Sequence, residues 1–440
     1  MRKILQIIAC FIIFALTLSV NASETVPIFY IDAKDKTATE IGTTLGKAIK
    51  KKWPTIEKKY DTYLAQVVEQ KQFNEWLPKK IRLIIPNIDP AYQDEVRAII
   101  STWNISHHDQ IGDGYLSLNE FWLLQLIIDI GNGPNGSGFG VFGTASVLGS
   151  PIVGRNLDWL TIEELRSLQA ITVYEYEQRT VVNIGFAGYV GVISGFNSDG
   201  LFVAYFNSPQ GILYPPPPRA EHAVVFDLRK ALETTTKISP AARIFYNKHY
   251  DSSHNILFAD KKTVKVLEQP LGLNAYLRTD KSPVRIEMLW NRIHQIAVVD
   301  CFVLRGSPTN CIHSIDRYQW HRFQKLAQFN SGQSAYVNDV INIMFDTLNP
   351  YQEIFNKNTV QSMVFTPKDQ KLYLYTVPLS GIHDAMPLMK EVSLMIPVSK
   401  NQTSYFSKIL FIIGFLILIG IWIYGNYSFL INKIKNFKES

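Results

Sequence analysis

Acidic and histidine side chains in one short segment are the first groups whose spacing could bind a metal. The segment from Asp109 to Glu120 has glycine at its sixth position and an acid at its twelfth, as a calcium-binding loop has. Ile111 stands where an oxygen ligand is required, so we expect a turn before a helix. His107 and His108 have no third ligand at helical spacing, which favours a surface pair over a metal site. The sequence therefore predicts no metal and no cofactor.

The two cysteines outside the apolar N-terminal run could form a disulfide. A turn-forming stretch with Gly306 and Pro308 separates Cys301 from Cys311. In an oxidising compartment the two thiols could pair across a hairpin, and two free buried thiols are the alternative. Cys10 is ordinary content of the apolar N-terminal run.

Short motifs of other function classes are absent. The chain has no Gly-x-Ser-x-Gly elbow, no His-Glu-x-x-His and no phosphate-cradling loop. The net charge of +6 is spread along the chain apart from one lysine cluster, made of Lys47, Lys50, Lys51, Lys52, Lys58 and Lys59. A solvated helix face is the expected role of this cluster, and contact with anionic lipid is the alternative. No nucleic-acid motif accompanies it, so we expect no nucleic-acid partner.

The N-terminus has the pattern of a secretory signal. Arg2 and Lys3 precede an uncharged run, and the small residues Asn21 and Ala22 precede Glu24. A retained N-terminal membrane helix is the alternative. We interpret residues 1–22 as a signal peptide.

The C-terminus has the pattern of a membrane anchor. Nothing between Lys408 and Lys433 is charged, and at about 1.5 Å per residue this run crosses a hydrocarbon core of roughly 30 Å. We expect a transmembrane helix at 408–432. The lysines of the tail 433–440 place it in the cytoplasm, which puts the main domain on the non-cytoplasmic side (periplasmic, lumenal or extracellular).

Apolar spacing divides the exported part into a helical segment and a β-rich segment. Helical periodicity marks Ala38–Ile49, Thr55–Val68, Ala91–Trp103 and Leu118–Ile130. Short β-branched or aromatic runs follow at 171–176, 181–186, 191–196, 201–205, 255–258 and 263–268, with a hairpin turn at Asp199-Gly200. We expect a helical N-terminal segment at 23–130 and a layered α+β domain at 131–400.

One stretch, Gly143–Trp159, carries a resemblance to a known family. Its final Gly-Arg-Asn-Leu-Asp-Trp and the hairpin before it resemble the start of the catalytic domain in the isopenicillin-N acyltransferase-like hydrolases. This N-terminal-nucleophile group includes acid ceramidase and the phospholipase-B-like proteins. Four further segments are similar to the family in the same order, namely Pro90–Arg97, Gly188–Leu201, Asn255–Glu268 and Ser314–Tyr318. The resemblance covers about residues 38 to 330 and implies a four-layer αββα domain.

The resemblance also implies a reaction and a set of site residues. In this family a nucleophile at a self-cut chain N-terminus attacks an acyl amide or ester, and its own α-amine is the base. Arg155 and Asp158 match the family's motif and would orient the nucleophile and the acyl carbonyl. Trp159, Asn197 and Arg317 fall in matching segments and are implied substrate contacts.

Two positions depart from the family's pattern. Gly136 stands on the position of the nucleophilic cysteine, and a slip of one residue puts Ser137 there. The alternative for Ser137 is a polar residue in a flexible loop, because the ten residues from Gly131 to Gly140 include five glycines. Asp300 stands where the family has an oxyanion-holding asparagine, and a negative charge there opposes catalysis unless it is protonated.

Two functions remain open on this sequence. The first is a membrane-anchored amidohydrolase or acyltransferase that acts on an acyl amide or lipid-like substrate, with Ser137, Arg155, Asp158 and Asp300 at its catalytic site. The second is a catalytically silent relative that binds an acyl ligand or a partner protein. A purely structural envelope protein would explain the anchor but not the ordered segments. For Arg155 and Asp158 a buried structural ion pair is an equally open role.

Overall fold

The computed structural model describes residues 26–208, 221–308, 311, 314–327, 333–348 and 353–396. The expected signal peptide at 1–22, membrane helix at 408–432 and tail at 433–440 lie outside these residues. Within them, no helix is both long and apolar enough to cross a bilayer.

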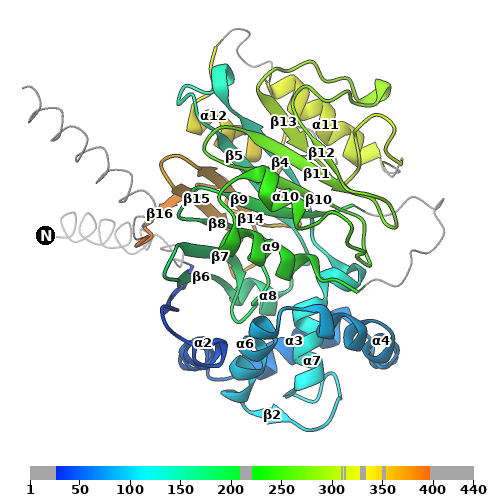
Figure 1. Ribbon diagram of the computed structural model, residues 1–440, viewed down its shortest axis with the longest axis vertical. Helices are drawn as coiled ribbons and strands as arrows, with labels where there is room; N and C mark the ends of the chain where they lie inside the picture. The colour runs from blue at the N-terminus through cyan, green and yellow to red at the C-terminus, as the bar shows by residue number, and fades with distance from the viewer. Residues whose placement is uncertain are drawn as a thin grey trace, which may run out of the picture.

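Two large sheets form the centre of the fold (Figure 1). The eight-stranded sheet has the order β1 (Ile28–Asp32), β6 (Gln169–Glu175), β7 (Thr180–Phe186), β8 (Ser194–Asn197), β9 (Phe202–Asn207), β10 (His254–Ala259), β11 (Val264–Gln269) and β12 (Tyr276–Arg278). The six-stranded sheet has the order β13 (Gln295–Val298), β4 (Asn135–Val141), β5 (Ile152–Asp158), β14 (Thr359–Thr366), β15 (Lys371–Thr376) and β16 (Lys390–Val392). A small two-stranded sheet pairs β2 (Ile105–Ser106) with β3 (Leu116–Ser117).

The inner faces of the two large sheets pack on each other through one apolar cluster. Phe196 and Phe202 of the eight-stranded sheet stack on Phe365 of the six-stranded sheet, with ring centroids 4.2 and 5.6 Å apart. Val182 and Met363 belong to the same buried cluster. The strands alternate their side chains, so every second residue is committed to this interface.

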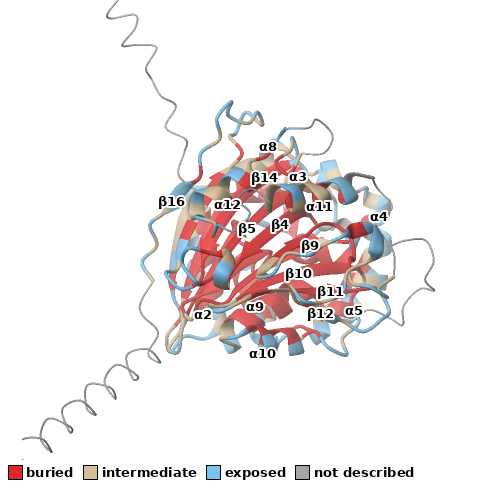
Figure 2. Cartoon of the chain, turned by 90° about the horizontal axis from the view of Figure 1, so that it is seen from above, coloured by how far each residue is buried: buried red, intermediate tan, exposed pale blue. Residues whose placement is uncertain are grey.

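Helices cover the outer faces of both sheets, as Figure 2 shows from above. On the eight-stranded sheet, α9 (Val224–Thr234) packs on β7, β8 and β9 with α10 (Ile238–Arg243) beside it, and α2 (Ala38–Lys52) packs on the edge strand β1. The other helices that share a buried apolar cluster with them are α3 (Ile56–Val67), α4 (Gln70–Trp76), α6 (Pro90–Ser101), α7 (Leu118–Leu126) and α8 (Glu163–Ser167). The six-stranded sheet is covered by α11 (Ser314–Ala327) and α12 (Val337–Met344). Short helical segments complete the set: Leu77–Ile81, α5 (Arg82–Ile84), Ile85–Asn87, Ile128–Asn132, Gly143–Ala145 and Ile286–Met288. The α+β class expected from the sequence is confirmed.

Local signals in the sequence start these elements. Capping boxes begin several of the helices; for example, Thr37 with Glu40 begins α2, and Ser117 with Glu120 begins α7. The segment from Asp109 is therefore a turn before a helix, as expected. Gly200 closes the β8–β9 hairpin with a φ of +86°, a conformation that glycine adopts without strain.

A buried charge cluster fastens the helical layer to the eight-stranded sheet. Arg229 of α9 donates to Glu95 of α6 at 2.8 Å and to Glu233 at 2.8 Å. Its guanidinium lies 4.1 Å from the ring centroid of Tyr174 on β6. Burial raises the pKa of Glu95, although the charge of Arg229 opposes this shift. Removing the cation would leave a carboxylate buried without its partner.

We therefore expect Arg229→Met to lower the free energy of unfolding of the full chain by about 3–5 kcal/mol. Arg97→Met is the matched control, because Arg97 forms an exposed pair with Asp94 on α6 and should change stability by only about 0–1 kcal/mol. Denaturant titration followed by circular dichroism measures both. Equal losses in the two variants would contradict this role of Arg229.

Candidate functional site

The β4–β5 hairpin brings most of the expected site residues into register. The two strands are antiparallel, and Asn135 lies opposite Asp158 while Ser137 lies opposite Asn156. Arg155 is three residues before the end of β5. The hairpin is central in the six-stranded sheet, so these side chains are set by pairing on both sides.

Arg155 is a fully buried cation on the inner face of the sheet. Its Nη2 donates to the backbone oxygen of Tyr205 at 2.8 Å, and its guanidinium lies 5.2 Å from the ring centroid of Phe206. Its Nε and Nη1 have no hydrogen-bond partner among the described residues. Burial lowers the pKa of Arg155 to about 9, while the nearby carboxyls of Asp158 and Asp300 raise it. The side chain is charged at neutral pH and keeps two donors free.

Asp158 ends β5 with both carboxyl oxygens engaged. Oδ1 accepts from the Thr359 hydroxyl at 2.6 Å, and Oδ2 accepts from the Asn356 amide at 2.7 Å. Burial raises the pKa of Asp158, against the lowering effect of these hydrogen bonds and of the Arg155 charge. Among the described residues Arg155 has no direct salt bridge to Asp158, so the two form an electrostatic pair at a distance.

Asp300 reaches the same place from the segment after β13. Its Oδ1 accepts from the backbone amide of Gly136 at 2.9 Å. Burial raises its pKa well above the usual range, and the carboxyls of Asp316 and Asp158 raise it further. A protonated Asp300 is therefore favoured at the position where the resemblance expects an amide.

A disulfide follows Asp300 directly. Cys301 and Cys311 are bonded to each other, which decides between the two alternatives left open by the sequence. The amide of Asn255 on β10 donates to the backbone oxygens of Val299 at 2.9 Å and Cys301 at 3.1 Å. The backbone on both sides of Asp300 is thus held to the eight-stranded sheet.

Ser137 points to the opposite face of the sheet from Arg155. Phe139, two residues on, packs in the cluster beneath α11 and α12, so Ser137 faces the same helical layer. Gly136 faces the inner side, since a Cβ added there would lie 3.5 Å from the ring of Phe206, which also borders Arg155. Ser137 is fully buried, and its hydroxyl has no partner among the described residues. The structure therefore brings Gly136, not Ser137, to the face that carries Arg155.

A cavity of about 520 Å³ opens at the end of the hairpin. Its polar and aromatic lining includes Tyr63, Asn135, Asp158, Trp159, Asn207 and Asn358. The described lining residues contain no serine, threonine or cysteine. The described walls can offer amide and carboxyl groups to a ligand, but no aliphatic hydroxyl or thiol to attack it.

Trp159 forms one wall of this cavity, where the resemblance expected a substrate contact. Its ring packs edge-on against Phe186 at 5.6 Å, and its backbone amide donates to Asn358 O at 2.9 Å. Asn207 at the end of β9 and Tyr63 of α3 face the same cavity and were not expected from the sequence. A polar residue at the last position of a buried strand, as Asn207 is in β9, is the signal that could have found it.

Two expected substrate contacts lie elsewhere. The Asn197 amide donates to the backbone oxygens of Leu232 and Thr235, both at 2.8 Å, and its oxygen accepts from Leu201 N at 3.0 Å. Asn197 thus closes the β8–β9 turn with its amide already in use. Arg317 is exposed on α11. The structure does not bring either residue to the cavity.

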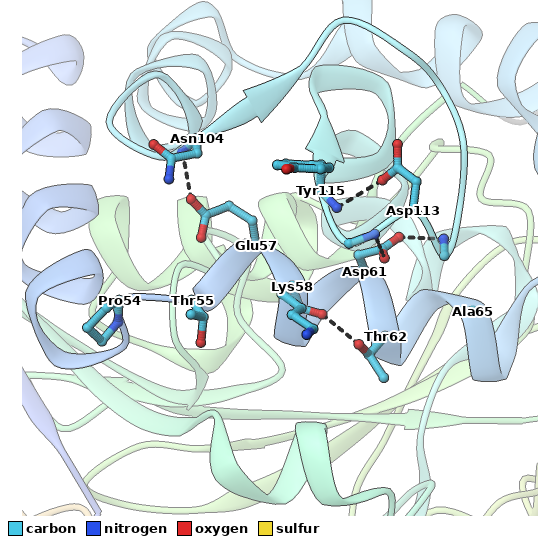
Figure 3. A pocket seen from close by; sticks show the side chains of 12 residues that line it. Pro54, Thr55, Glu57, Lys58, Asp61, Thr62, Ala65, Asn104, Asp113 and Tyr115 are labelled. Carbon is cyan, nitrogen blue, oxygen red and sulfur yellow. Dashed lines mark hydrogen bonds between the residues drawn. The ribbon is translucent and has the colours of Figure 1, made fainter.

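A larger cavity of about 610 Å³ lies between α3 and the loop before α7 and contains none of the expected site residues (Figure 3). Asp61 in its wall accepts from the amides of Gly112 and Gly114, both at 2.6 Å. These hydrogen bonds fix the loop after Asp109, whose residue spacing resembles that of a calcium-binding loop. No cluster of three metal-binding side chains occurs within the described residues.

Comparison with known proteins gives distant structural likenesses only. No protein-family model and no curated protein sequence matches the chain. A Caenorhabditis elegans N-acylethanolamine-hydrolyzing acid amidase ortholog is 18% identical with a TM-score of 0.38, over 52% of this chain and 92% of that one. A mutant of the conjugated bile acid hydrolase from Clostridium perfringens is 13% identical with a TM-score of 0.35, over 59% and 97%. Penicillin V acylase from Agrobacterium tumefaciens is 11% identical with a TM-score of 0.35, over 60% and 88%. Because every TM-score is below 0.5, these likenesses carry no conclusion about the site.

The raised pKa of Asp300 predicts how stability depends on pH. Because the pKa of Asp300 is raised in the folded chain, that chain holds the proton to a higher pH than the unfolded chain, which releases it above about pH 4. The stabilisation is complete below that pH and is lost as the pH rises through the folded pKa. Over that window Asp300→Asn should remove a slope of up to about 1.4 kcal/mol per pH unit. Unfolding free energies measured across pH test this.

Asp94→Asn is the control for this series, because Asp94 is exposed on α6. Its pH profile should run parallel to that of the wild-type chain. If the Asp300→Asn profile is also parallel to wild type, Asp300 does not hold a proton in the folded state.

Proposed function

We propose that this chain is an exported, membrane-anchored relative of the N-terminal-nucleophile hydrolases that binds an acyl amide or ester in the cavity beside Trp159 without cleaving it. The cavity's size and its mixed aromatic and amide lining support this proposal, since small-molecule sites combine an apolar body with a few placed polar groups. The observation that carries it is a cavity walled by Asp158 and Trp159 whose described lining holds no serine, threonine or cysteine.

The backbone at Gly136 has no room for the side chain of a nucleophile. Gly136 has a φ of +153°, and a Cβ there would lie 2.1 Å from the backbone oxygen of Asn156. A cysteine at this position would clash with a backbone atom of the neighbouring strand. The β4–β5 pairing therefore suits glycine at the position where the family has its nucleophile.

The electrostatics of the site favour binding over acyl transfer. A nucleophilic attack needs donors aimed at the oxygen on which negative charge develops. Asp300 contributes a carboxyl to this region, and it accepts a hydrogen bond from Gly136 N instead of leaving that amide free. The amide groups of Asn135, Asn207 and Asn358 on the cavity wall are the donors that can hold a neutral carbonyl oxygen.

The competing function is an amidohydrolase or acyltransferase with Ser137 as the nucleophile. It is favoured by one observation, the buried Ser137 hydroxyl without a partner among the described residues. Ser137 would have to leave its pairing with Asn156 and turn to the opposite face of the sheet after a cut before it. Arg155 and Asp158 would then set the geometry of the acyl carbonyl.

Replacing the aromatic wall tests the binding site. We expect the full chain to bind a fluorescent fatty-acyl amide and Trp159→Ala to weaken binding by roughly tenfold or more, because the ligand loses a large apolar contact worth about 1.5–3 kcal/mol. Fluorescence titration measures affinity, and mass spectrometry of the recovered probe should find it intact.

Trp290→Ala is the matched control, since Trp290 is a half-buried tryptophan that packs against Trp320 at 4.8 Å beneath α11. It should leave affinity unchanged. Equal affinity in wild type and Trp159→Ala would place the ligand elsewhere, and release of the free acid from the probe would favour the hydrolase.

A further inference from the structure

Exposed apolar side chains gather on the segment between β15 and the last described residue. We name the set of Leu379, Ile382, Met386, Leu388 and Met395 the 379–395 surface; these residues are 50, 74, 83, 68 and 72% exposed. Single exposed apolar residues are common, but five within 17 residues of one segment indicate a contact surface.

The segment that carries these residues is fastened to the domain. The ring of His383 packs 4.5 Å from the ring of Phe355, and its nitrogens lie 3.2 Å from the Tyr375 hydroxyl and 3.1 Å from Asn356 O. The backbone amide of Asp384 also meets the Tyr375 hydroxyl, at 3.3 Å. Neighbouring apolar side chains are therefore held outward by a fixed backbone.

The 379–395 surface continues to the mouth of the candidate cavity. Arg166 of α8 donates to Leu379 O at 3.0 Å and also to Thr161 O. Leu160, the residue before Thr161, is 46% exposed and lines the cavity. One arginine thus joins the surface to the cavity rim.

The chain beyond the described residues limits what can face this surface. Ile396 is the last residue described, and the uncharged apolar run 409–424 begins 13 residues later in the sequence. Thirteen residues span at most about 45 Å. A membrane anchor in that run would therefore keep the 379–395 surface near the bilayer.

We propose that the 379–395 surface contacts the lipid bilayer, with Ile382, Met386 and Leu388 entering the boundary between head groups and acyl chains. A bilayer fits side chains that project singly from a fixed segment, because each can enter the interface without a matching pocket. This proposal rests on the anchor in the proposed function. It deepens that function, since Leu160 would then place the cavity rim at the membrane surface, where a ligand with an acyl chain is found.

Lipid quenching at matched positions tests this contact. The full chain after signal removal, in which Cys301 and Cys311 are bonded to each other, carries a nitrobenzoxadiazole label at Ile382→Cys or at Ile286→Cys and is reconstituted into phosphatidylcholine vesicles with a minority of phosphatidylglycerol. Ile286 is the control because it is 75% exposed, against 74% for Ile382, and lies before β13 at the opposite edge of the six-stranded sheet. Lipids brominated near the head group should remove most of the emission at 382 and none at 286. A label at Leu388→Cys repeats the test if the first variant does not fold.

Several outcomes would overturn the proposal. These are no quenching at 382 and 388, equal quenching at 286, or chains that fail to float with the vesicles. Shielding of 382 that depends on protein density but not on bromine would assign the surface to a second copy of the chain. The Trp159→Ala titration is independent of these results, so failure of the membrane contact and failure of ligand binding are distinguishable.

Discussion

The antiparallel register of β4 with β5 is the constraint on which the site depends. Because side chains alternate across a strand, a single register decides which residues share a face. Here it gives the inner face Gly136 and Arg155, and it turns Ser137 toward the helical layer. A shift by one residue would turn Ser137 to the inner face and Gly136 to the helical layer. It would also turn Phe139 toward the other sheet. The packing of Phe139 beneath α11 therefore stabilises the arrangement that keeps Ser137 off the face that carries Arg155.

Buried charge gives this site its character. Arg155, Asp158 and Asp300 all lie inside the fold. Burial lowers the pKa of Arg155 and raises the pKa values of Asp158 and Asp300, so it favours the neutral form of each. Two hydrogen bonds satisfy Asp158, while Arg155 keeps two unused donors. The amide groups of Asn135, Asn207 and Asn358 on the cavity wall could hold a carbonyl group without bringing new charge into the interior. This is why the arrangement suits a neutral acyl ligand better than a developing oxyanion beside Asp300.

Local sequence patterns predicted the elements with strong periodicity. The helical runs at 38–49 and 118–130 correspond to α2 and α7, and the hairpin at Asp199-Gly200 joins β8 to β9 as expected. These elements are set by neighbours in the sequence, through capping boxes and turn glycines. Strand β4 was missed as a strand, because its alternating glycines are typical of a loop and only pairing with β5 makes them extended. The parallel pairing of β1 with β6 joins segments about 140 residues apart and leaves no local signal.

The candidate site was only partly predictable for the same reason. Arg155, Asp158 and Trp159 came from one contiguous motif; the structure places Asp158 and Trp159 on the cavity wall and Arg155 within the electrostatic influence of Asp158. Tyr63 and Asn207 come from a helix and a strand far away in the sequence, so their convergence depends on the fold. Asn197 also ends a buried strand, but its side-chain amide forms hydrogen bonds with Leu201 in the β8–β9 turn and with Leu232 and Thr235.

The central claim is that this chain keeps its β4 strand intact and has no working nucleophile. The intact mass of the purified full chain, after signal removal, tests it most directly. The account predicts one uncut chain whose mass changes on Ser137→Ala only by the loss of one oxygen. Two fragments that part immediately before Ser137 in the wild type, and a single chain in Ser137→Ala, would contradict it and establish a self-processed serine enzyme.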